Sequence, residues 1–272
     1  MNFAQKLDKS IDKNSSLLCV GLDPDLSKIP PFIQQTTHPL FEFNKEIIDA
    51  TNDLVSVYKP NAAFYEAEGA HGIEQLKMTC DYIHKICSDI PVLLDFKRGD
   101  IGNTNDRYCT FAFEYLGVEA CTVQPYAGRE SLMPFLKYDD KGIFVLCKTS
   151  NPGSGELQDL KVDGKPLYML IAEKVVKFWN ENGNVMLVVG ATYPKELKSL
   201  RAIAGEMTFL VPGIGSQGGI IEASLAAGLN SKGRGLIINA SRGIIYAGFE
   251  NDFASKAREK ALELRKTINK FR

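Results

Sequence analysis

Long apolar runs are absent from this 272-residue sequence. No stretch approaches the ~18 consecutive apolar residues that a membrane-crossing helix requires. The first residues, MNFAQKLDKSIDKNSSLLCVGLD, also lack the apolar region of a secretory signal peptide. We therefore expect a cytoplasmic protein without a membrane segment.

An excess of charge of either sign is absent as well. Lysine and arginine together number 32, aspartate and glutamate number 33, and the formal net charge is −1. Binding to nucleic acid or to a membrane surface usually depends on a marked positive excess, so we expect neither kind of partner. If the ligand is an anion, a local group of positive side chains must hold it.

Cysteine and histidine are sparse, and their spacing matches no common disulfide or metal pattern. The six cysteines are Cys19, Cys80, Cys87, Cys109, Cys121 and Cys147. They form no C-x-x-C pair, and several lie in apolar runs, where cysteine behaves as a small hydrophobic residue. The three histidines, His38, His71 and His84, fall in helical or pre-helical segments, and we interpret them as surface or packing residues. We expect no metal and no disulfide framework.

What the sequence does contain is a regular alternation of short apolar runs and amphipathic segments. The apolar runs cover residues 17–22, 54–59, 91–96, 120–124, 142–148, 185–190, 208–213 and 235–240. Each is continuously apolar, which is typical of parallel strands buried on both faces. With a helix expected near 2–13, eight strand–helix units predict that residues 1–272 form a single α/β domain, a (β/α)8 TIM barrel with an N-terminal helix. A doubly wound open sheet is the alternative, but the G-x-G-x-x-G typical of its first turn is absent.

Charged residues follow three consecutive predicted strands. Asp23 follows the first and Lys59 ends the second, while Asp95 and Lys97 end the third and Asp100 lies just beyond. The i, i+2 spacing of Asp95 and Lys97 places both on one face of an extended segment. Each residue alone fits a turn or a solvated strand end. Their joint occurrence predicts a catalytic cluster, because barrel enzymes place reactive groups at the C-terminal ends of strands.

Two glycine-rich turns follow the last two predicted strands. They are VPGIGSQGG at 211–219 and NASRG at 239–243, which contains Arg242. Loops at these two positions commonly bind phosphate in this fold, and an arginine can bind phosphate bidentately. The segment KTSNPGSGE at 148–156 follows the fifth strand and has the composition of a loop that covers a ligand. The sequence thus predicts a phosphate site, although glycines of this kind also make ordinary tight turns.

Taken together, these motifs resemble the orotidine 5′-phosphate decarboxylase family, in its longer bacterial-type branch. The strongest match is the D-x-K-x-x-D-I-G-N-T element that begins at Asp95. It is supported by GLDP around Asp23, YKPN around Lys59 and TSNPGS around Ser150, and by PGIGSQGG and ASRG further on. The elements occur in the family's order between residues 21 and 243.

The resemblance implies conversion of orotidine 5′-monophosphate (OMP) to UMP and CO2, in de novo pyrimidine nucleotide biosynthesis, without a cofactor. It implies a catalytic network of Lys59, Asp95, Lys97 and Asp100, in which Lys97 protonates a carbanion at C6 of the pyrimidine. It also implies a homodimer, in which Asp100 and Thr104 enter the neighbouring subunit's site. The substrate-binding residues that it implies are Asp23, Ile101, Thr104, Ser150, Pro212, Gly215, Gln217, Arg242 and Gly243.

Three other interpretations of the same residues remain. A relative acting on a sugar phosphate with Mg²⁺ would share the barrel, the phosphate loops and the D-x-K-x-x-D element, but Lys59, Ser150 and Gln217 suit a nucleobase better. A barrel that only binds a phosphorylated ligand would need no such set of charged residues. The tripeptide at 98–100, Arg-Gly-Asp, also occurs in cell-adhesion ligands, but a three-residue match arises often by chance.

Overall fold

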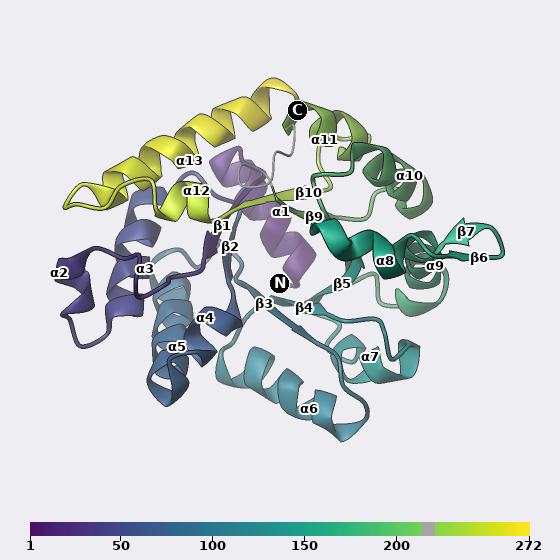
Figure 1. Cartoon of the computed structure of the whole chain (residues 1–272), viewed down its shortest axis with the longest axis horizontal. Coiled ribbons are helices and arrows are strands. Elements are labelled where there is room, and N and C mark those ends of the chain that lie inside the picture. The colour runs from purple at the N-terminus through teal and green to yellow at the C-terminus, as the bar shows by residue number, and fades with distance from the viewer. Residues whose placement is uncertain (214–220) are drawn as a thin grey trace.

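The computed structural model describes residues 1–213 and 221–272. Its centre is a barrel of eight parallel strands, with helices around it (Figure 1). The barrel strands are β1 (Leu18–Leu22), β2 (Val57–Pro60), β3 (Leu93–Arg98), β4 (Ala120–Val123), β5 (Gly142–Lys148), β8 (Val185–Val189), β9 (Phe209–Pro212) and β10 (Leu236–Ala240). Each strand overlaps one of the predicted apolar runs, so the (β/α)8 barrel is confirmed.

The barrel closes where β2 and β3, the two ends of the strand order, lie side by side. The strands follow the order β2-β1-β10-β9-β8-β5-β4-β3, and all neighbouring pairs are parallel. Two isolated bridges, Tyr58 with Val92 and Asn61 with Asp95, join β2 to β3. The second bridge lies at the C-terminal ends of these strands and brings the YKPN motif next to the D-x-K motif.

The helices surround the strands in Figure 1, except α1, which lies across the middle of the barrel in that view. They are α1 (Phe3–Asn14), α2 (Pro31–Gln34), α3 (Pro39–Thr51), α4 (Ala62–Glu66), α5 (Gly69–Ile86), α6 (Asn103–Cys109), α7 (Arg129–Leu136), α8 (Gly155–Gln158), α9 (Leu167–Lys174), α10 (Pro194–Ala204), α11 (Ile221–Gly228), α12 (Arg242–Ile245) and α13 (Phe253–Lys270). Helices α6 and α9 continue as π-helical turns at Thr110–Tyr115 and Val175–Trp179. A short antiparallel hairpin, β6 (Lys161–Val162) and β7 (Lys165–Pro166), projects from the β5–α9 connection and was not predicted.

The predicted N-terminal helix is present as α1, and it packs against the N-terminal ends of the strands. Asn2 begins it with a capping box, in which its side chain accepts from Gln5 N–H and the Gln5 side chain accepts from Asn2 N–H. Phe3 packs edge-on against Phe144, with ring centroids 5.6 Å apart. A Cβ on Gly142 would lie 2.5 Å from the Phe3 ring, so only glycine lets β5 begin so close to this helix.

The residues of β1, β5, β8 and β10 are buried along the whole length of these strands, as expected of parallel strands covered on both faces. All six cysteines are buried and unpaired, and they pack as the sequence predicts. Within the described residues, no helix is long and apolar enough to cross a membrane.

Candidate active site

The C-terminal ends of the barrel strands surround a cavity of about 180 Å³. Most of the residues predicted to act together line this cavity, although they come from opposite ends of the sequence. They are Asp23, Lys59, Asp95, Lys97, Pro212, Arg242 and Gly243. Because the carboxyl ends of parallel strands meet at one end of a barrel, the fold brings these side chains together as expected.

The centre of the site is a carboxylate held between two ammonium groups. Lys59 Nζ lies 3.0 Å from Asp95 Oδ2, and Lys97 Nζ lies 2.6 Å from Asp95 Oδ1. The Lys59 side chain is only 3% exposed and that of Asp95 10%, whereas that of Lys97 is 45% exposed. Lys97 is therefore the member of the trio that is open to an incoming ligand.

The buried members of this trio stabilise each other's charge. Burial alone would lower the pKa of Lys59, but the negative charges of Asp95 and Asp23 outweigh it and raise this pKa above its ordinary value. Burial alone would raise the pKa of Asp95, but the ammonium groups of Lys59 and Lys97 outweigh it and hold this pKa well below its ordinary value. Lys59 and Asp95 are consequently both ionised across the neutral pH range.

The backbone at Lys97 is strained in order to present its side chain. Lys97 has φ of 45°, in the left-handed region that non-glycine residues rarely adopt. The register of β3 against β4 shifts between Leu94 and Arg98, so the strand is irregular here. Thr122 on β4 holds this geometry, because its hydroxyl accepts from Lys97 N–H at 3.0 Å and donates to Asp95 Oδ1 at 2.9 Å. Strain of this kind is typical of a functional position.

Asp23 has one carboxylate oxygen that the protein itself does not satisfy. The Ser241 hydroxyl donates to Asp23 Oδ2 at 2.5 Å. The other oxygen, Asp23 Oδ1, is buried and has no hydrogen-bond partner among the described residues. A buried acceptor without a partner costs free energy. Asp23 Oδ1 is therefore suited to accept a hydrogen bond from a hydroxyl group of a ligand in the cavity.

Arg242 and Gly243 line the side of the cavity formed by β9 and β10, together with Pro212. Arg242 is exposed. A guanidinium in this position can bind an anionic group. The predicted residues Gly215 and Gln217 lie outside the described residues, so their predicted contacts with phosphate stay predictions.

Four other predicted residues do not line the cavity of their own chain. Ser150 lies just after β5, where its backbone packs so closely on Gly190 that a Cβ there would come within 2.8 Å. Asp100 and Ile101 are exposed, and Thr104 is half-buried at the start of α6. The side chain of Asn105 fixes this turn, since it accepts from Asp100 N–H and donates to Asp100 C=O. The turn is therefore held by hydrogen bonds, and Asp100, Ile101 and Thr104 do not line the cavity of the single chain.

The sequence interpretation missed four polar residues that line the cavity. They are Asn61, Thr122, Asn239 and Ser241. Each lies at or just after the C-terminal end of a barrel strand, which is the signal that could have identified them. It also missed the buried Lys148 at the end of β5, which lies 2.6 Å from Asp159 and over the Tyr193 ring. Lys148 anchors the segment that carries Ser150.

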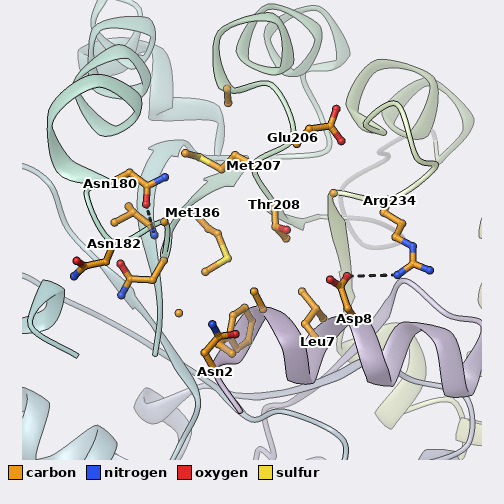
Figure 2. Close-up of a pocket in the computed structure, with 18 of the residues that line it drawn as sticks. Asn2, Leu7, Asp8, Asn180, Asn182, Met186, Glu206, Met207, Thr208 and Arg234 are labelled. Carbon is orange, nitrogen blue, oxygen red and sulfur yellow. Dashed lines mark hydrogen bonds and ion pairs between the residues drawn. The ribbon is translucent and has the colours of Figure 1, made fainter. Parts of the chain in front are cut away.

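A larger cavity, of about 620 Å³, lies at the opposite end of the barrel, between α1 and the N-terminal strand ends (Figure 2). Figure 2 shows asparagine amides and Met186 around it, with Arg234 reaching Asp8 at its rim. The active sites of TIM-barrel enzymes lie at the C-terminal ends of the strands, not at the end where this larger cavity lies. In addition, the described residues around this larger cavity include no buried carboxylate between ammonium groups. The smaller cavity is therefore the candidate active site.

The fold and the cavity define the class of this protein. It is an enzyme that acts on an anionic small molecule with charged side chains held in fixed positions. Residues 16–257 match the family model described as "Orotidine 5'-phosphate decarboxylase / HUMPS family". The chain belongs to this family, as the motifs around Asp95 predict.

Close relatives cover the whole chain. The orotidine 5′-phosphate decarboxylases of Cupriavidus metallidurans and of Azoarcus sp. are each 49% identical over 272 residues, covering 100% of this chain and 99% and 100% of theirs. Leishmania donovani OMP decarboxylase has a TM-score of 0.86 and 43% identity, covering 100% of this chain and 98% of its own. Leishmania donovani UMP synthase has a TM-score of 0.90 and 45% identity, and this chain spans 56% of its length.

Proposed function

We propose that this chain is the decarboxylase that converts OMP to UMP and CO2, in de novo pyrimidine nucleotide biosynthesis. The observation that carries the proposal is the Asp95 carboxylate held between Lys59 and Lys97 in the cavity at the strand ends. Full-length likeness to orotidine 5′-phosphate decarboxylases supports this substrate over a sugar phosphate.

The reaction needs the kind of stabilisation that this network provides. When the bond from C6 to the carboxylate breaks, CO2 leaves and the electron pair remains on C6, in the plane of the ring. The π system of the pyrimidine cannot delocalise that pair, so preorganised positive charge must stabilise it. Lys97 supplies an ammonium group for this purpose and then transfers a proton to C6, which gives UMP and a neutral lysine.

Asp95 and Lys59 prepare Lys97 for this step. Asp95 fixes the Lys97 ammonium group by a hydrogen bond of 2.6 Å, and it would lie beside the departing carboxylate of OMP. Repulsion between the Asp95 carboxylate and the substrate carboxylate would disfavour the bound substrate relative to the transition state, in which the substrate carboxylate is becoming neutral CO2. Lys59 keeps Asp95 ionised and in place from the opposite side.

The rest of the substrate is distributed over the other lining residues. Arg242 and Gly243, with Pro212 beside them, would bind the phosphate group, and Gly215 would add its backbone N–H. Asp23 would accept a hydrogen bond from a ribose hydroxyl through its unpartnered Oδ1. Ser150 would contact the pyrimidine edge, and Gln217 would bridge the loop of Ser150 to the phosphate. Binding energy from the distant phosphate can then help to order the site around C6.

The active form is proposed to be a homodimer with shared sites. Asp100, Ile101 and Thr104 lie on an ordered turn that does not reach the cavity of its own chain. Ile101 is 61% exposed, which is a large exposed fraction for an apolar side chain on an ordered turn. Such a turn could insert Asp100 and Thr104 beside the Lys97 of a second subunit, as the family resemblance implies.

Two organisational points belong to the same proposal. Residues 1–272 would act as one domain, since α13 packs against α3, and Asn269 donates to Ser15 C=O beside α1. The protein would act in the cytoplasm, where its buried thiols remain reduced.

The deciding experiment is a spectrophotometric assay of OMP consumption by purified protein, with and without EDTA. We expect loss of the OMP absorbance at an equal rate in both samples, with UMP and CO2 as products. Activity that EDTA abolishes and Mg²⁺ restores, or activity only on a sugar phosphate, would contradict the proposal. Binding of OMP without turnover would indicate a barrel that only binds its ligand.

A further inference from the structure

The fold brings together two histidines and a glutamate that are not part of the active site. His38 immediately precedes α3, whereas His71 and Glu74 lie in the first turns of α5. One ligand atom from each residue lies within 4.8 Å of those of the other two. The two imidazole rings have centroids 5.2 Å apart. None of the three residues lines the cavity around Lys97.

The spacing between His71 and Glu74 already fits a metal. His71 Nδ1 lies 3.4 Å from Glu74 Oε2. Zn²⁺ binds histidine nitrogen at ~2.0–2.1 Å and carboxylate oxygen at ~2.0–2.2 Å, so two ligand atoms on a tetrahedral zinc ion lie roughly 3.4 Å apart. The pair is thus at bridging distance before any side chain moves.

The other nitrogen of His71 has the partner that a metal-binding histidine usually has. His71 Nε2 lies 2.9 Å from the backbone carbonyl oxygen of Thr37. A carbonyl can only accept, so Nε2 carries the proton and donates. In the neutral ring, Nδ1 then carries a lone pair, and it faces the Glu74 carboxylate. Ligating histidines typically donate their second N–H to a carbonyl or carboxylate in this way, which fixes the tautomer and the ring orientation.

His38 lacks a complete set of partners within the protein. Its Nδ1 atom is buried and has no hydrogen-bond partner among the described residues. His84 provides the contrast, because its Nε2 contacts both oxygens of Glu119. The ring of His38 is therefore not fixed at Nδ1 by hydrogen bonds, and a small rotation can bring a ring nitrogen to the ion.

We propose that His38, His71 and Glu74 form a binding site for a divalent transition metal, of which Zn²⁺ is the best match. Imidazole ligands favour zinc and its first-row neighbours over Mg²⁺ and Ca²⁺, which prefer sites made only of oxygen. Three protein ligands leave the fourth position to water. The ion joins the segment before α3 to α5, at the rim of the barrel, and takes no part in decarboxylation.

The competing explanation of the geometry is a protonated His71 in an ion pair with Glu74. The side chains of His71 and Glu74 are 49% and 61% exposed, and an ion pair this exposed to water contributes little to stability. Coordination bonds to a metal ion are several times stronger than such an exposed pair.

The test is zinc binding by untagged, reduced protein, measured by competition with a chromophoric chelator. Wild type should bind one Zn²⁺ per chain, and Glu74→Gln, His71→Ala and His38→Gln should each weaken binding at least about 10-fold. His84→Gln is the matched control, since it removes the third histidine outside the cluster, and it should bind like wild type. Glu74→Gln is nearly isosteric at an exposed position, so it separates loss of a ligand from loss of folding.

Two further measurements use the same proteins. Zn²⁺ should raise the thermal unfolding temperature of wild type and His84→Gln but not of Glu74→Gln, because the ion binds only the folded state. Co²⁺ should give a spectrum without a thiolate band, since all six cysteines are buried. The proposal is wrong if wild type binds no stoichiometric Zn²⁺, if Glu74→Gln and His71→Ala bind it like wild type, or if Co²⁺ shows thiolate ligation.

Discussion

The two ends of the barrel carry cavities of opposite character. The cavity at the N-terminal strand ends measures about 620 Å³, whereas that at the C-terminal ends measures about 180 Å³. At the larger one, ionised groups such as Asp8 and Arg234 pair at the surface, where Asp8 is 64% exposed. At the smaller one, Asp95 is buried between Lys59 and Lys97. The convergence of buried charge, and not the volume, distinguishes the candidate active site.

The physical reason lies in the cost of desolvation. Moving a carboxylate or an ammonium group out of water costs several kcal/mol, and a buried ion pair is often no more stabilising than apolar residues of the same size. The surface pair at the N-terminal end gives up little hydration, and it needs no special function to explain it. Burying Lys59 and Asp95 at the C-terminal end costs free energy of desolvation, which fits a role in catalysis. Five predictions test this comparison.

The largest effect is expected for Lys97→Ala. Removing the proposed proton donor and carbanion-stabilising charge should lower kcat by at least about 10⁴-fold. The Kd for UMP should change far less, because the interaction is made mainly in the transition state. Lys232→Ala, at the rim of the larger cavity, is the control and should keep its activity. Steady-state kinetics measure kcat, and UMP titration measures the Kd. Near-normal turnover together with poor UMP binding would show that Lys97 only binds the ligand.

Mixing two inactive variants tests whether the C-terminal cavity is shared between subunits. Lys97→Ala and Asp100→Ala, mixed under conditions of subunit exchange, should recover about a quarter of wild-type activity. Half of the dimers would then be mixed, and one of their two sites would carry neither change. Lys97→Ala with Lys59→Ala should recover nothing, since both residues line the same chain's cavity. Absence of recovery in the first mixture, despite proven exchange, would contradict a shared site.

Stability measurements should separate the two ends next. Asp95→Asn should lower the free energy of unfolding by about 3–5 kcal/mol at pH 7, because Lys59 stays buried without its counter-charge. Asp8→Asn at the other end should cost less than about 1 kcal/mol. Denaturant unfolding of both variants measures the difference. Equal losses would remove the energetic distinction between the cavities.

The same variant has an expected pH dependence. The pKa of Asp95 is lower in the folded protein than in the unfolded chain. The contribution of ionised Asp95 to the free energy of unfolding is therefore complete above the pKa of an aspartate in the unfolded chain, about 3.9. This contribution is lost as the pH falls toward the lower pKa of the folded state. The gap in stability between wild type and Asp95→Asn should stay constant from pH 8 to pH 6 and narrow below about pH 4. A gap that narrows at neutral pH would contradict the ionised state assigned to Asp95.

The smallest expected effect on activity concerns the phosphate side of the cavity. Arg242→Ala should lower kcat/KM for OMP by about 10- to 150-fold, which corresponds to a charge-assisted hydrogen bond of about 1.5–3 kcal/mol. For orotidine, which has no phosphate, kcat/KM should hardly change. If Arg242 were only a surface residue, both substrates would respond equally and weakly. Kinetics on the two substrates with wild type and variant decide between these outcomes.

Much of the site could be predicted from sequence because barrel strands are contiguous and their ends converge. Each of five residues lies at or within two residues of the end of an apolar run, and the structure places all five around one cavity: Asp23, Lys59, Asp95, Lys97 and Arg242. The prediction was weaker for residues whose role depends on a partner. Thr122 holds Asp95 and Lys97 through a hydrogen bond between strands, which no local pattern shows.

The histidines show the same limit more sharply. The sequence interpretation treated His38, His71 and His84 as unrelated surface or packing residues. His84 does pack against Glu119, but His38, just before α3, meets His71 on α5 beside Glu74. The i, i+3 spacing of His71 and Glu74 was visible in the sequence, whereas the third member was not. A ligand set assembled from separate helices exists only once those helices pack together.

The sequence by itself determined the barrel, its N-terminal helix and the family, because apolar periodicity and the motif at Asp95 are local properties of the chain. Tertiary structure alone decided which charges are buried, since burial depends on the residues that surround a side chain from other strands. It decided the strained backbone of Lys97, which Thr122 on the next strand helps to hold. It also placed Asp100 outside the lining of its own chain's cavity, on a turn that the side chain of Asn105 on α6 holds by hydrogen bonds to the Asp100 backbone.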